Sequence, residues 1–376
     1  MVKIKELKSN FSILGFSNIL SYGISGIFWL YLASILTKED YGEVGFLISI
    51  GATASAFAVL GSSNSLVVLR AKNIQIQSTF FIIVILLSLV ASIATYFIVG
   101  NYAISLYIIG GAIFSLSIYN LLGSKSYQKF AKYLVLQRIL LVIFAITLYQ
   151  ILGIEGIILG YVASFLIFIK IIFKEIRCCK IDFSLFRNNF GFIIKNYITI
   201  LVKVISANID KLIIFPIFGA TFLGTYLLAF QIFTLIMVIP TITYQYILPQ
   251  EASGNKNSRI KKYTIIASIL IVALTIIMSP ILIPITHPNY SESIPAIQIM
   301  SIAIIPNAIS LIWISELLGK KETKTVLIGS LITSGVLSLG IIILGKEFQI
   351  MGAAFSLVLA RSLEMAYIGV VKYRNR

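Results

Sequence analysis

Charged side chains are scarce in this chain. Asp, Glu, Lys and Arg make up 12% of its 376 residues, whereas 59% are hydrophobic and the mean hydropathy is +0.99. So few polar groups cannot cover a water-soluble globule of this size, which excludes a soluble protein. The apolar runs have helix length and lack the strict alternation of an outer-membrane barrel. We therefore predict an all-α integral membrane protein, because backbone groups in lipid must be satisfied within the protein.

Residue types that support catalysis or bind metals are also few. The chain has one histidine, His287, which we expect in an outer loop, and two adjacent cysteines, Cys178 and Cys179, which we interpret as unpaired thiols. It shows no paired carboxylates at a suitable spacing, no glycine-rich phosphate loop and no nucleophile with a histidine base. We therefore predict no enzymatic activity, no cofactor and no metal site. Without an ATP motif, the energy must come from an ion or membrane gradient, or from downhill substrate flux.

Basic residues outnumber acidic ones, 30 to 14, which gives a net charge of +16. They gather in the short gaps between apolar runs, which is typical of membrane topology, so we expect no nucleic-acid partner. Placing both termini in the cytoplasm leaves only Lys38 and Lys346 on the outer face. The inner face then carries Lys3, Lys5, Lys8, Arg70, Lys72, Lys125, Lys129, Lys132, Lys174, Arg177, Lys180, Arg187, Lys256, Arg259, Lys261, Lys262, Lys320, Lys321, Lys324, Lys372, Arg374 and Arg376. We predict a multi-pass protein of the cell (cytoplasmic) membrane.

The apolar runs predict about twelve transmembrane helices with short connections. Their expected ranges are 11–36, 43–69, 78–99, 103–123, 133–152, 154–173, 192–215, 223–248, 262–285, 293–315, 325–344 and 351–371. We expect two pseudo-symmetric six-helix bundles, residues 1–180 and 181–376. All eight prolines lie in the second half, where several fall inside expected helices and can kink them.

The two halves of the chain show a weak internal repeat. The segment 36–50 follows the first expected helix and 218–232 follows the seventh, so that Gly42 and Gly224 occupy the same place in a short external turn. Gly156 and Gly352 each open the last helix of a six-helix half. Because each half would hold an even number of helices, the repeat predicts two bundles related by an axis along the membrane normal.

Two stretches of the sequence resemble the signature regions of a transporter family. These are GISGIFWLYLASILTKEDYGEVGF at 23–46 and SANIDKLIIFPIFGATFLGTYLLAF at 206–230. They resemble polysaccharide-biosynthesis membrane proteins, the O-antigen (Wzx-type) flippases of the multidrug/oligosaccharidyl-lipid/polysaccharide exporter superfamily. In that family an Asp-Lys pair precedes an apolar stretch, a loop and a Gly-x-Tyr; here these are Asp210, Lys211, Gly224 and Tyr226.

The resemblance implies transport of a polyisoprenoid-linked oligosaccharide from the cytoplasmic to the outer face. It further implies alternating access through a cleft between two six-helix bundles. The expected partners are this anionic pyrophosphate carrier and the membrane lipids, with a coupling ion left open, and we expect a monomer.

One lysine lies near the middle of the seventh expected helix. Asn196, Thr199, Lys203, Ser206 and Asp210 follow one helical stripe, and a charge at bilayer depth costs about 2.5–3.5 kcal/mol by insertion scales. We expect Lys203 to face the cleft and attract the carrier pyrophosphate. The structural alternatives are an ion pair with Glu364 or Glu316, or snorkelling. Asp210, about 10 Å farther along the helix axis, is expected to reach water at the outer rim.

Further candidate contacts come from other helices. Asn18 and Ser21 on the first helix suit contacts with sugars, although small polar residues are also ordinary contacts between membrane helices. Arg70 and Arg138 are expected to line the cytoplasmic mouth and draw in an anionic headgroup. The alternative for Arg70 is a residue that only sets the topology.

Two other functions compete with the flippase. A cation-coupled multidrug exporter should carry membrane-embedded acids, whereas this chain offers Asp210 near one helix end and a lysine in the middle. A membrane polysaccharide polymerase or ligase should carry a large external loop with catalytic residues. The longest external connection expected here is 287–292 and its flanks.

Overall fold

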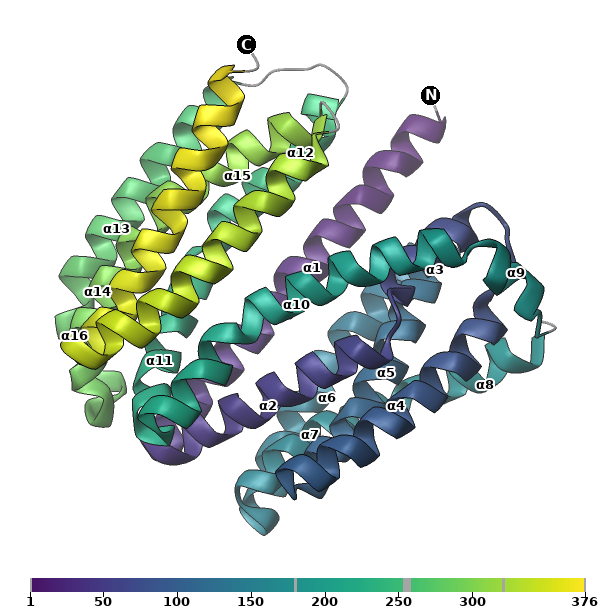
Figure 1. The fold of residues 1–376 in the computed structure, drawn as a ribbon, viewed down its shortest axis with the longest axis horizontal. Helices are drawn as coiled ribbons and strands as arrows, with labels where there is room; N and C mark the ends of the chain where they lie inside the picture. Colours follow the sequence, from purple (N-terminus) through teal and green to yellow (C-terminus); the bar gives the residue numbers. More distant parts are fainter. Residues whose placement is uncertain (1, 179–180, 253–257, 320–321, 375–376) are drawn as a thin grey trace. The chain divides into compact units, whose positions relative to one another are not determined.

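The computed structural model of the chain describes residues 2–178, 181–252, 258–319 and 322–374, and within them it contains helices and no strands (Figure 1). The helices are α1 (Val2–Ile35), α2 (Lys38–Ala58), α3 (Ser62–Ala71), α4 (Gln77–Val99), α5 (Tyr102–Gly123), α6 (Tyr127–Leu152), α7 (Ile154–Phe165), η1 (Leu166–Phe168), α8 (Ile169–Cys178), α9 (Phe183–Asn188), α10 (Phe190–Phe218), α11 (Ala220–Ile236), α12 (Val238–Ala252), α13 (Ser258–Thr286), η2 (Pro288–Ser293), α14 (Ile294–Ile302), α15 (Ile304–Gly319) and α16 (Thr323–Arg374).

The helices carry apolar faces that suit lipid. In the described residues, eight helices are long and apolar enough to cross a membrane, and two bent helix pairs raise this number to ten. Along α13, five aliphatic residues three or four positions apart form one stripe in which every side chain is more than half exposed: Leu270, Leu274, Ile277, Ile281 and Ile285. An apolar stripe of this length has no place in water, so the protein is a multi-pass membrane protein.

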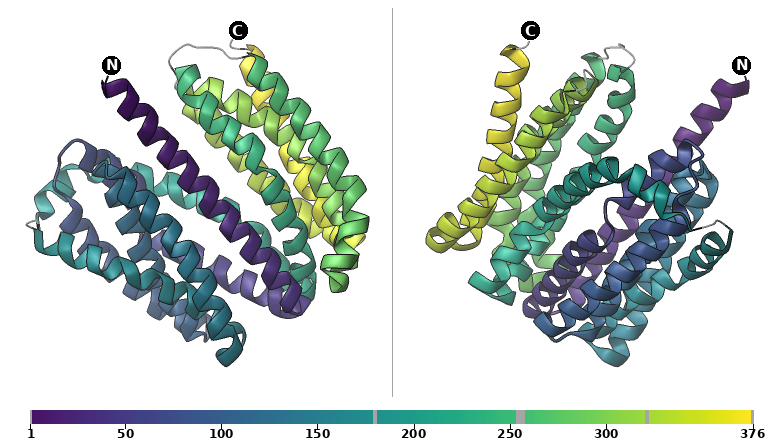
Figure 2. Two further views of the ribbon diagram at one scale, coloured as in Figure 1. Left: turned by 180° about the vertical axis from the view of Figure 1, so that it is seen from behind. Right: turned by 45° about the vertical axis from the view of Figure 1, so that its right-hand side comes forward.

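The helical segments cover all twelve expected ranges. The helix α16 has 52 residues and would be about 78 Å long if straight, more than twice the thickness of a hydrocarbon core. Its helical geometry breaks at Gln349, where φ is 51° and ψ is −134°. Gly329 lies near Glu364, and Gly340 near Ser356, so the two halves of α16 are antiparallel neighbours (Figures 1 and 2). They correspond to the expected helices 325–344 and 351–371.

Two expected helices are bent by more than 40° in the described residues, one in each half of the chain. The range 43–69 divides into α2 and α3 with a bend of 45°, and the range 223–248 divides into α11 and α12 with a bend of 41°. The first break has left-handed backbone at Leu60 and Gly61 and involves no proline, whereas Pro240 follows the second break by three residues. Each bend therefore interrupts the second expected helix of its half, although prolines occur in only one half.

The chain folds into two compact units. Unit 1 comprises Met1–Phe28 and Leu47–Ile205, and unit 2 comprises Trp29–Phe46 and Ser206–Arg376. In unit 1, α5 packs against α3, α4 and α7. In unit 2, α15 packs against α12, α13 and α16. The expected bundle boundary between residues 180 and 181 stays a prediction.

The paired glycines of the repeat pack against each other in unit 2. A Cβ atom on Gly42 would lie 2.0 Å from the Ala220 carbonyl oxygen, and one on Gly224 would lie 1.9 Å from the Lys38 carbonyl oxygen. Both glycines were expected in turns. They lie instead in the second turns of α2 and α11, because both helices begin several residues before the expected ranges. Their role is therefore close helix contact, which only a residue without a side chain permits.

The second glycine pair shows the same local geometry twice. A Cβ atom on Gly156 would meet the Leu148 carbonyl oxygen at 2.1 Å, and one on Gly352 would meet the Leu344 carbonyl oxygen at 1.9 Å. Each glycine thus packs on the carbonyl eight residues before it, directly after the sharp turn between two helices. The match supports the repeat that the sequence indicated.

We expect Gly224→Ala to destabilise the protein by about 1–3 kcal/mol, because the added methyl group overlaps the backbone of α2. The matched control is Gly335→Ala in α16, where no atom lies within 4 Å of the added methyl group and alanine is the better helix former. Thermal unfolding in detergent should show a lower midpoint for the first variant only. Equal midpoints for the two variants would contradict the close contact.

His287 lies in the loop between α13 and η2, as the sequence suggested, but its side chain is buried. It is only 9% exposed, and its Nε2 atom lies 3.0 Å from the Leu30 carbonyl oxygen. Nearby, Lys38 pairs with Glu292 at 2.8 Å, and the Tyr41 and Tyr290 rings meet edge to face. The histidine therefore helps hold the 29–46 segment on the η2 region of unit 2.

The membrane orientation stays a prediction. The side chains of Lys3, Lys5, Lys8, Arg177, Lys180, Lys256, Lys320, Lys321 and Arg376, and those of Cys178 and Cys179, lie outside what the structure describes.

Candidate functional site

A cavity of about 260 Å³ opens inside unit 1. Its walls come from α2, α3, α5, α6, α7 and α10. Hydroxyl, aromatic and guanidinium groups line it together with aliphatic residues: Ser55, Ser63, Ser115, Tyr107, Tyr119, Tyr161, Phe114, Phe165 and Arg138. We call this space the Arg138 pocket. Polar groups in an otherwise apolar cavity are typical of ligand sites.

The aromatic wall of the Arg138 pocket is ordered by ring contacts. The Tyr107 ring meets Tyr161 edge to face at 5.6 Å and Phe165 at 5.8 Å. A Cβ atom on Gly51 of α2 would lie 2.6 Å from the Tyr107 ring. The ring therefore occupies space that is free because residue 51 has no side chain. Phe114 stacks on Phe165 at 5.4 Å. These contacts fix the side chains against which a ligand would pack.

Arg138 is the only charged residue that lines this pocket in the described part of the chain. It is half-buried, forms no ion pair with a described carboxylate, and has a buried Nε atom without a hydrogen-bond partner. A guanidinium carries five donors in a planar fork that matches phosphate or carboxylate oxygens. Burying it without an anion is costly, so the pocket is suited to an anionic ligand.

Lys203 lies outside the Arg138 pocket. Helix α10 gives Ile200 and Val204 to the pocket wall, whereas the Lys203 side chain is exposed. Among the described residues no carboxylate pairs with it. The two suggested partners are occupied elsewhere, since Glu364 pairs with Arg361 at 3.0 Å and Glu316 pairs with Lys261 and Lys372, both at 2.7 Å. Among the described residues, nothing supports the ion-pair alternative for Lys203.

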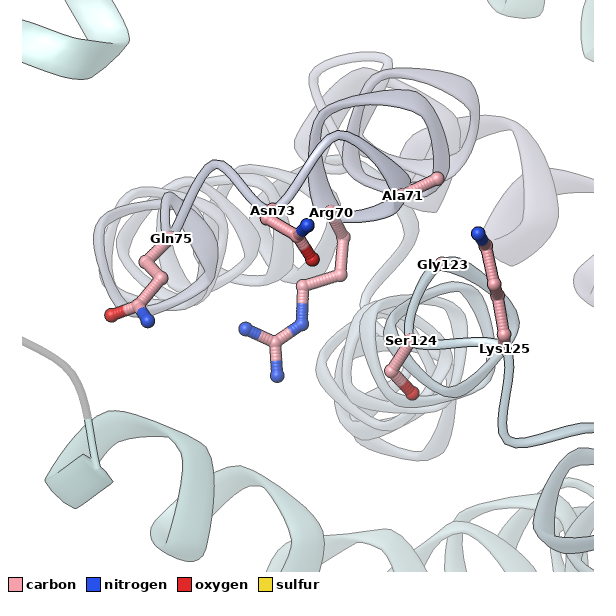
Figure 3. A pocket seen from close by; sticks show the side chains of 7 residues that line it. All are labelled: Arg70, Ala71, Asn73, Gln75, Gly123, Ser124 and Lys125. Carbon is pink, nitrogen blue, oxygen red and sulfur yellow. The ribbon is translucent and has the colours of Figure 1, made fainter.

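The sequence suggested that Arg70 and Arg138 line the same opening, but in the structure they line two separate pockets of unit 1. Arg70 lies at the end of α3 and lines a separate pocket with Lys125 (Figure 3). On α1, Ser21 is 5% exposed with a buried hydroxyl that has no hydrogen-bond partner, and Asn18 is half-buried. Neither residue lines the Arg138 pocket. The candidate residues of unit 1 are therefore distributed over separate places.

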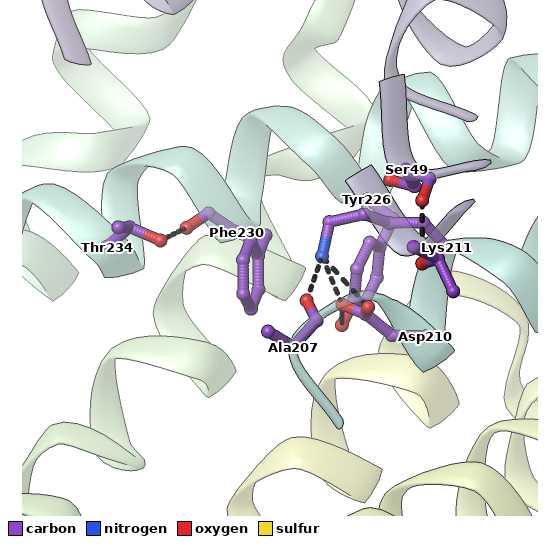
Figure 4. Close-up of polar contacts among 8 residues, drawn as sticks. Ser49, Ala207, Asp210, Lys211, Tyr226, Phe230 and Thr234 are labelled. Atoms are coloured by element: carbon purple, nitrogen blue, oxygen red, sulfur yellow. Dashed lines mark hydrogen bonds and ion pairs between the residues drawn. The ribbon is translucent and has the colours of Figure 1, made fainter. Parts of the chain in front are cut away.

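Asp210 and Lys211 form a buried pair in unit 2 (Figure 4). The Lys211 Nζ atom lies 2.8 Å and 3.1 Å from the two Asp210 oxygens and also donates to the Ala207 carbonyl oxygen. The Tyr226 hydroxyl donates to Asp210 at 2.9 Å, and Lys211 lies over the Phe230 ring at 4.3 Å.

Asp210 is 2% exposed, so the prediction that it reaches water is wrong. The reason is that its neighbour Lys211 turns back to the same carboxylate, an arrangement that stripe positions on a helix do not reveal. The Asp-Lys and Gly-x-Tyr elements of the sequence thus meet through the Tyr226 hydroxyl, and their shared role is to pack α10 against α11.

The described charges in or next to the predicted membrane helices show one asymmetry. The acids Asp210, Glu316 and Glu364 all have cationic partners, whereas the cations Arg138 and Lys203 form no ion pair. In the described residues, no group of three or more His, Cys, Asp and Glu side chains could hold a metal ion. The charges that remain available for a ligand are therefore positive.

A family model described as "Polysaccharide biosynthesis protein" matches residues 31–263, more than half of the chain. The chain belongs to this family. Among curated proteins, none is similar in sequence.

Solved transporter structures share the fold of this polysaccharide biosynthesis protein. The lipid II flippase MurJ in an inward closed conformation aligns with a TM-score of 0.77 at 15% identity, covering 96% of this chain and 87% of MurJ. An inward-facing multidrug resistance MATE family transporter of the MOP superfamily aligns with a TM-score of 0.70 at 15% identity, covering 95% and 94%. A eukaryotic MATE transporter gives a TM-score of 0.57 at 14% identity, covering 97% and 95%. The chain therefore shares the fold of these transporters.

Sequence reasoning missed the aromatic residues of the Arg138 pocket. The sequence of α5 did contain a relevant pattern. Gly111, Phe114 and Ser115 follow Tyr107 by four, seven and eight residues, so these four residues share one helix face. Such a face is ordinarily a helix contact. The cavity arises because small residues of α2, such as Ser55, oppose it in this polysaccharide biosynthesis protein.

Proposed function

We propose that this polysaccharide biosynthesis protein is a flippase for polyisoprenoid-linked oligosaccharide. It moves this cargo from the cytoplasmic to the outer face of the cell membrane by alternating access. The observation that carries the proposal is a charge asymmetry among the described residues: the acids Asp210, Glu316 and Glu364 are paired, whereas Arg138 and Lys203 form no ion pair there.

Unpaired cations favour a cargo that brings its own negative charge. The carrier lipid ends in a phosphate or pyrophosphate, whose oxygens can accept several hydrogen bonds from the Arg138 guanidinium. Sugars present flat apolar faces as well as hydroxyls, and both suit the tyrosines and serines of the Arg138 pocket. One pocket thus offers partners for the anionic and the sugar portions of such a cargo.

The multidrug exporter is the second candidate, because its fold is shared. A cationic drug is best held by an unpaired acid, whereas the described acids Asp210, Glu316 and Glu364 are already paired with cations. Arg138 would repel such a drug from the pocket. The polymerase or ligase alternative would require a cluster of catalytic side chains. Among the described residues, no group of three or more His, Cys, Asp and Glu side chains could hold a metal ion for such chemistry.

Cells that lack this protein should accumulate lipid-linked oligosaccharide on the inner leaflet. The wild-type gene should restore export, and Arg138→Gln should lower the export rate by about tenfold or more, because a hydrogen bond to a charged group contributes about 1.5–3 kcal/mol. Arg138→Lys keeps the charge and should retain part of the export. Export assays with equal membrane levels of the variants provide the measurement. Full export by Arg138→Gln would remove the pocket from the transport path.

A further inference from the structure

A second pocket of unit 1 lies away from the Arg138 pocket. It has a volume of about 310 Å³ and is lined by Arg70, Asn73, Gln75, Ser124 and Lys125, with Ala71 and Gly123. Figure 3 shows the Arg70 guanidinium between the 73–75 turn and the turn at Ser124 and Lys125. We call it the Arg70 pocket. Every polar side chain that lines it can donate hydrogen bonds.

Two helix ends build the Arg70 pocket in the same way. After α3, the Ile74 amide donates to the Leu69 carbonyl oxygen at 3.0 Å, and Asn73 has a φ of 62°. After α5, the Ser126 amide donates to the Leu121 carbonyl oxygen at 3.0 Å, and Lys125 has a φ of 57°. Both ends are Schellman motifs, so carbonyls of the last helical turns are already hydrogen-bonded.

The left-handed residues are informative because neither is glycine. Asparagine adopts this conformation readily, but lysine does so at a cost, and glycine is the usual residue there. The chain nevertheless has a lysine at position 125, and this residue lines the pocket. Gly123 lets α5 approach α3 closely, since its Cβ atom would lie 2.9 Å from the Arg70 Cβ atom. The two cations are thereby brought to one pocket.

The donors of this pocket are little used within the described residues. Arg70 has one ion pair, a long one of 3.5 Å to Glu175 on α8. Lys125 has no ion pair there, and the Asn73 and Gln75 side chains make no hydrogen bond in this part of the chain. Cations near helix C-termini also interact favourably with the helix dipole. That role does not explain why the amide side chains of Asn73 and Gln75 line the same pocket.

We propose that the Arg70 pocket binds the phosphate group of an acidic lipid. Two cations and two amides around a space of this volume match a phosphate with several acceptor oxygens. Lys72, Lys129 and Lys132 follow within a few residues, so this end of unit 1 is strongly basic. The predicted topology places this end at the inner leaflet, where basic clusters attract anionic lipids. The inference goes beyond the proposed cargo, because any phosphate-bearing lipid satisfies it.

The test uses the full-length protein, purified in detergent and stripped of lipid. Native mass spectrometry then measures binding of phosphatidylglycerol, a polyprenyl phosphate, and diacylglycerol as the phosphate-free lipid. The variants are Arg70→Gln and Lys125→Gly, alone and combined. Lys125→Gly keeps the left-handed turn while removing the ammonium, so lost binding cannot be attributed to a broken turn. Lys129→Gln, a neighbouring basic residue outside the pocket, is the matched control.

The double variant should bind the phosphate-bearing lipid about tenfold more weakly than the wild type or the control, while diacylglycerol binds none of them appreciably. Selective loss of phosphatidylglycerol identifies a bulk lipid as the occupant. Selective loss of polyprenyl phosphate identifies the carrier lipid. Unchanged binding of both lipids by the double variant overturns the proposal. The proposed flippase function does not depend on the Arg70 pocket and would still stand after that result.

Discussion

Replacing Lys203 with alanine is expected to abolish export of the surface glycan while the protein remains inserted and abundant. The Lys203 side chain is exposed on α10 and has no carboxylate partner among the described residues, so its removal leaves no buried group unpaired. Its cost at bilayer depth, about 2.5–3.5 kcal/mol, is explained if an anionic cargo interacts with it. Lys203→Arg keeps the charge with a different geometry and should retain part of the export.

The matched control for Lys203 lies on the same helix. Lys195 is two turns away and is also exposed, so Lys195→Ala tests the loss of a lysine from α10 without touching the proposed contact. Complementation of a flippase-deficient strain measures export, with membrane levels checked by immunoblotting. Normal export by Lys203→Ala would remove this residue from the cargo path, and loss of export by both variants would indicate a general effect of charge on α10.

The second large effect is on stability and concerns the buried pair of unit 2. Asp210→Ala should destabilise the protein by about 3–5 kcal/mol, because it leaves the Lys211 ammonium buried without its carboxylate and removes the acceptor of the Tyr226 hydroxyl. The double variant Asp210→Ala with Lys211→Ala removes both charges and should be more stable than the single variant. A double variant that is more stable than the single variant is characteristic of a buried ion pair, because one unpaired buried charge destabilises a protein more than the loss of both charges.

Denaturant titration in detergent, followed by circular dichroism, can compare these variants. Lys203→Ala is the control, since its exposed side chain should leave the unfolding midpoint unchanged. If the double variant were as unstable as Asp210→Ala, the ion pair would not be the source of the effect. An unchanged midpoint for Asp210→Ala would contradict the buried position of the carboxylate.

The fold could be predicted from the sequence because membrane helices depend on one simple quantity, the length of apolar runs. Apolar run length indicates membrane helices, and all twelve expected ranges are largely helical. Among the described residues, eight helices, or ten with the two bent pairs, are long and apolar enough to span a membrane, so the number of twelve spans stays a prediction. The glycine repeat was also informative, although the sequence placed Gly42 and Gly224 in turns and the structure places them in helix contacts. Helix ends are set by local hydrogen bonding rather than by hydropathy, which explains why α2 and α11 begin early.

The candidate site was harder to predict, because partners across helices are invisible in one sequence. Hydropathy could show that Arg138 is deep, but not that Tyr107 and Tyr161 share its cavity. It could show Asp210 near a helix end, but not that Lys211 turns back to it. The roles of Asn18 and Ser21 in cargo binding stay predictions.

Reconstituted transport tests the central claim most directly. The purified protein, inserted into liposomes, is supplied with a polyprenyl-pyrophosphate-linked oligosaccharide on one leaflet, and the fraction reaching the other leaflet is measured by enzymatic access to the glycan. In parallel, the same liposomes are tested for movement of a cationic drug. The proposed function predicts translocation of the oligosaccharide, its loss with Arg138→Gln, and no drug transport. Drug transport without oligosaccharide translocation would contradict it.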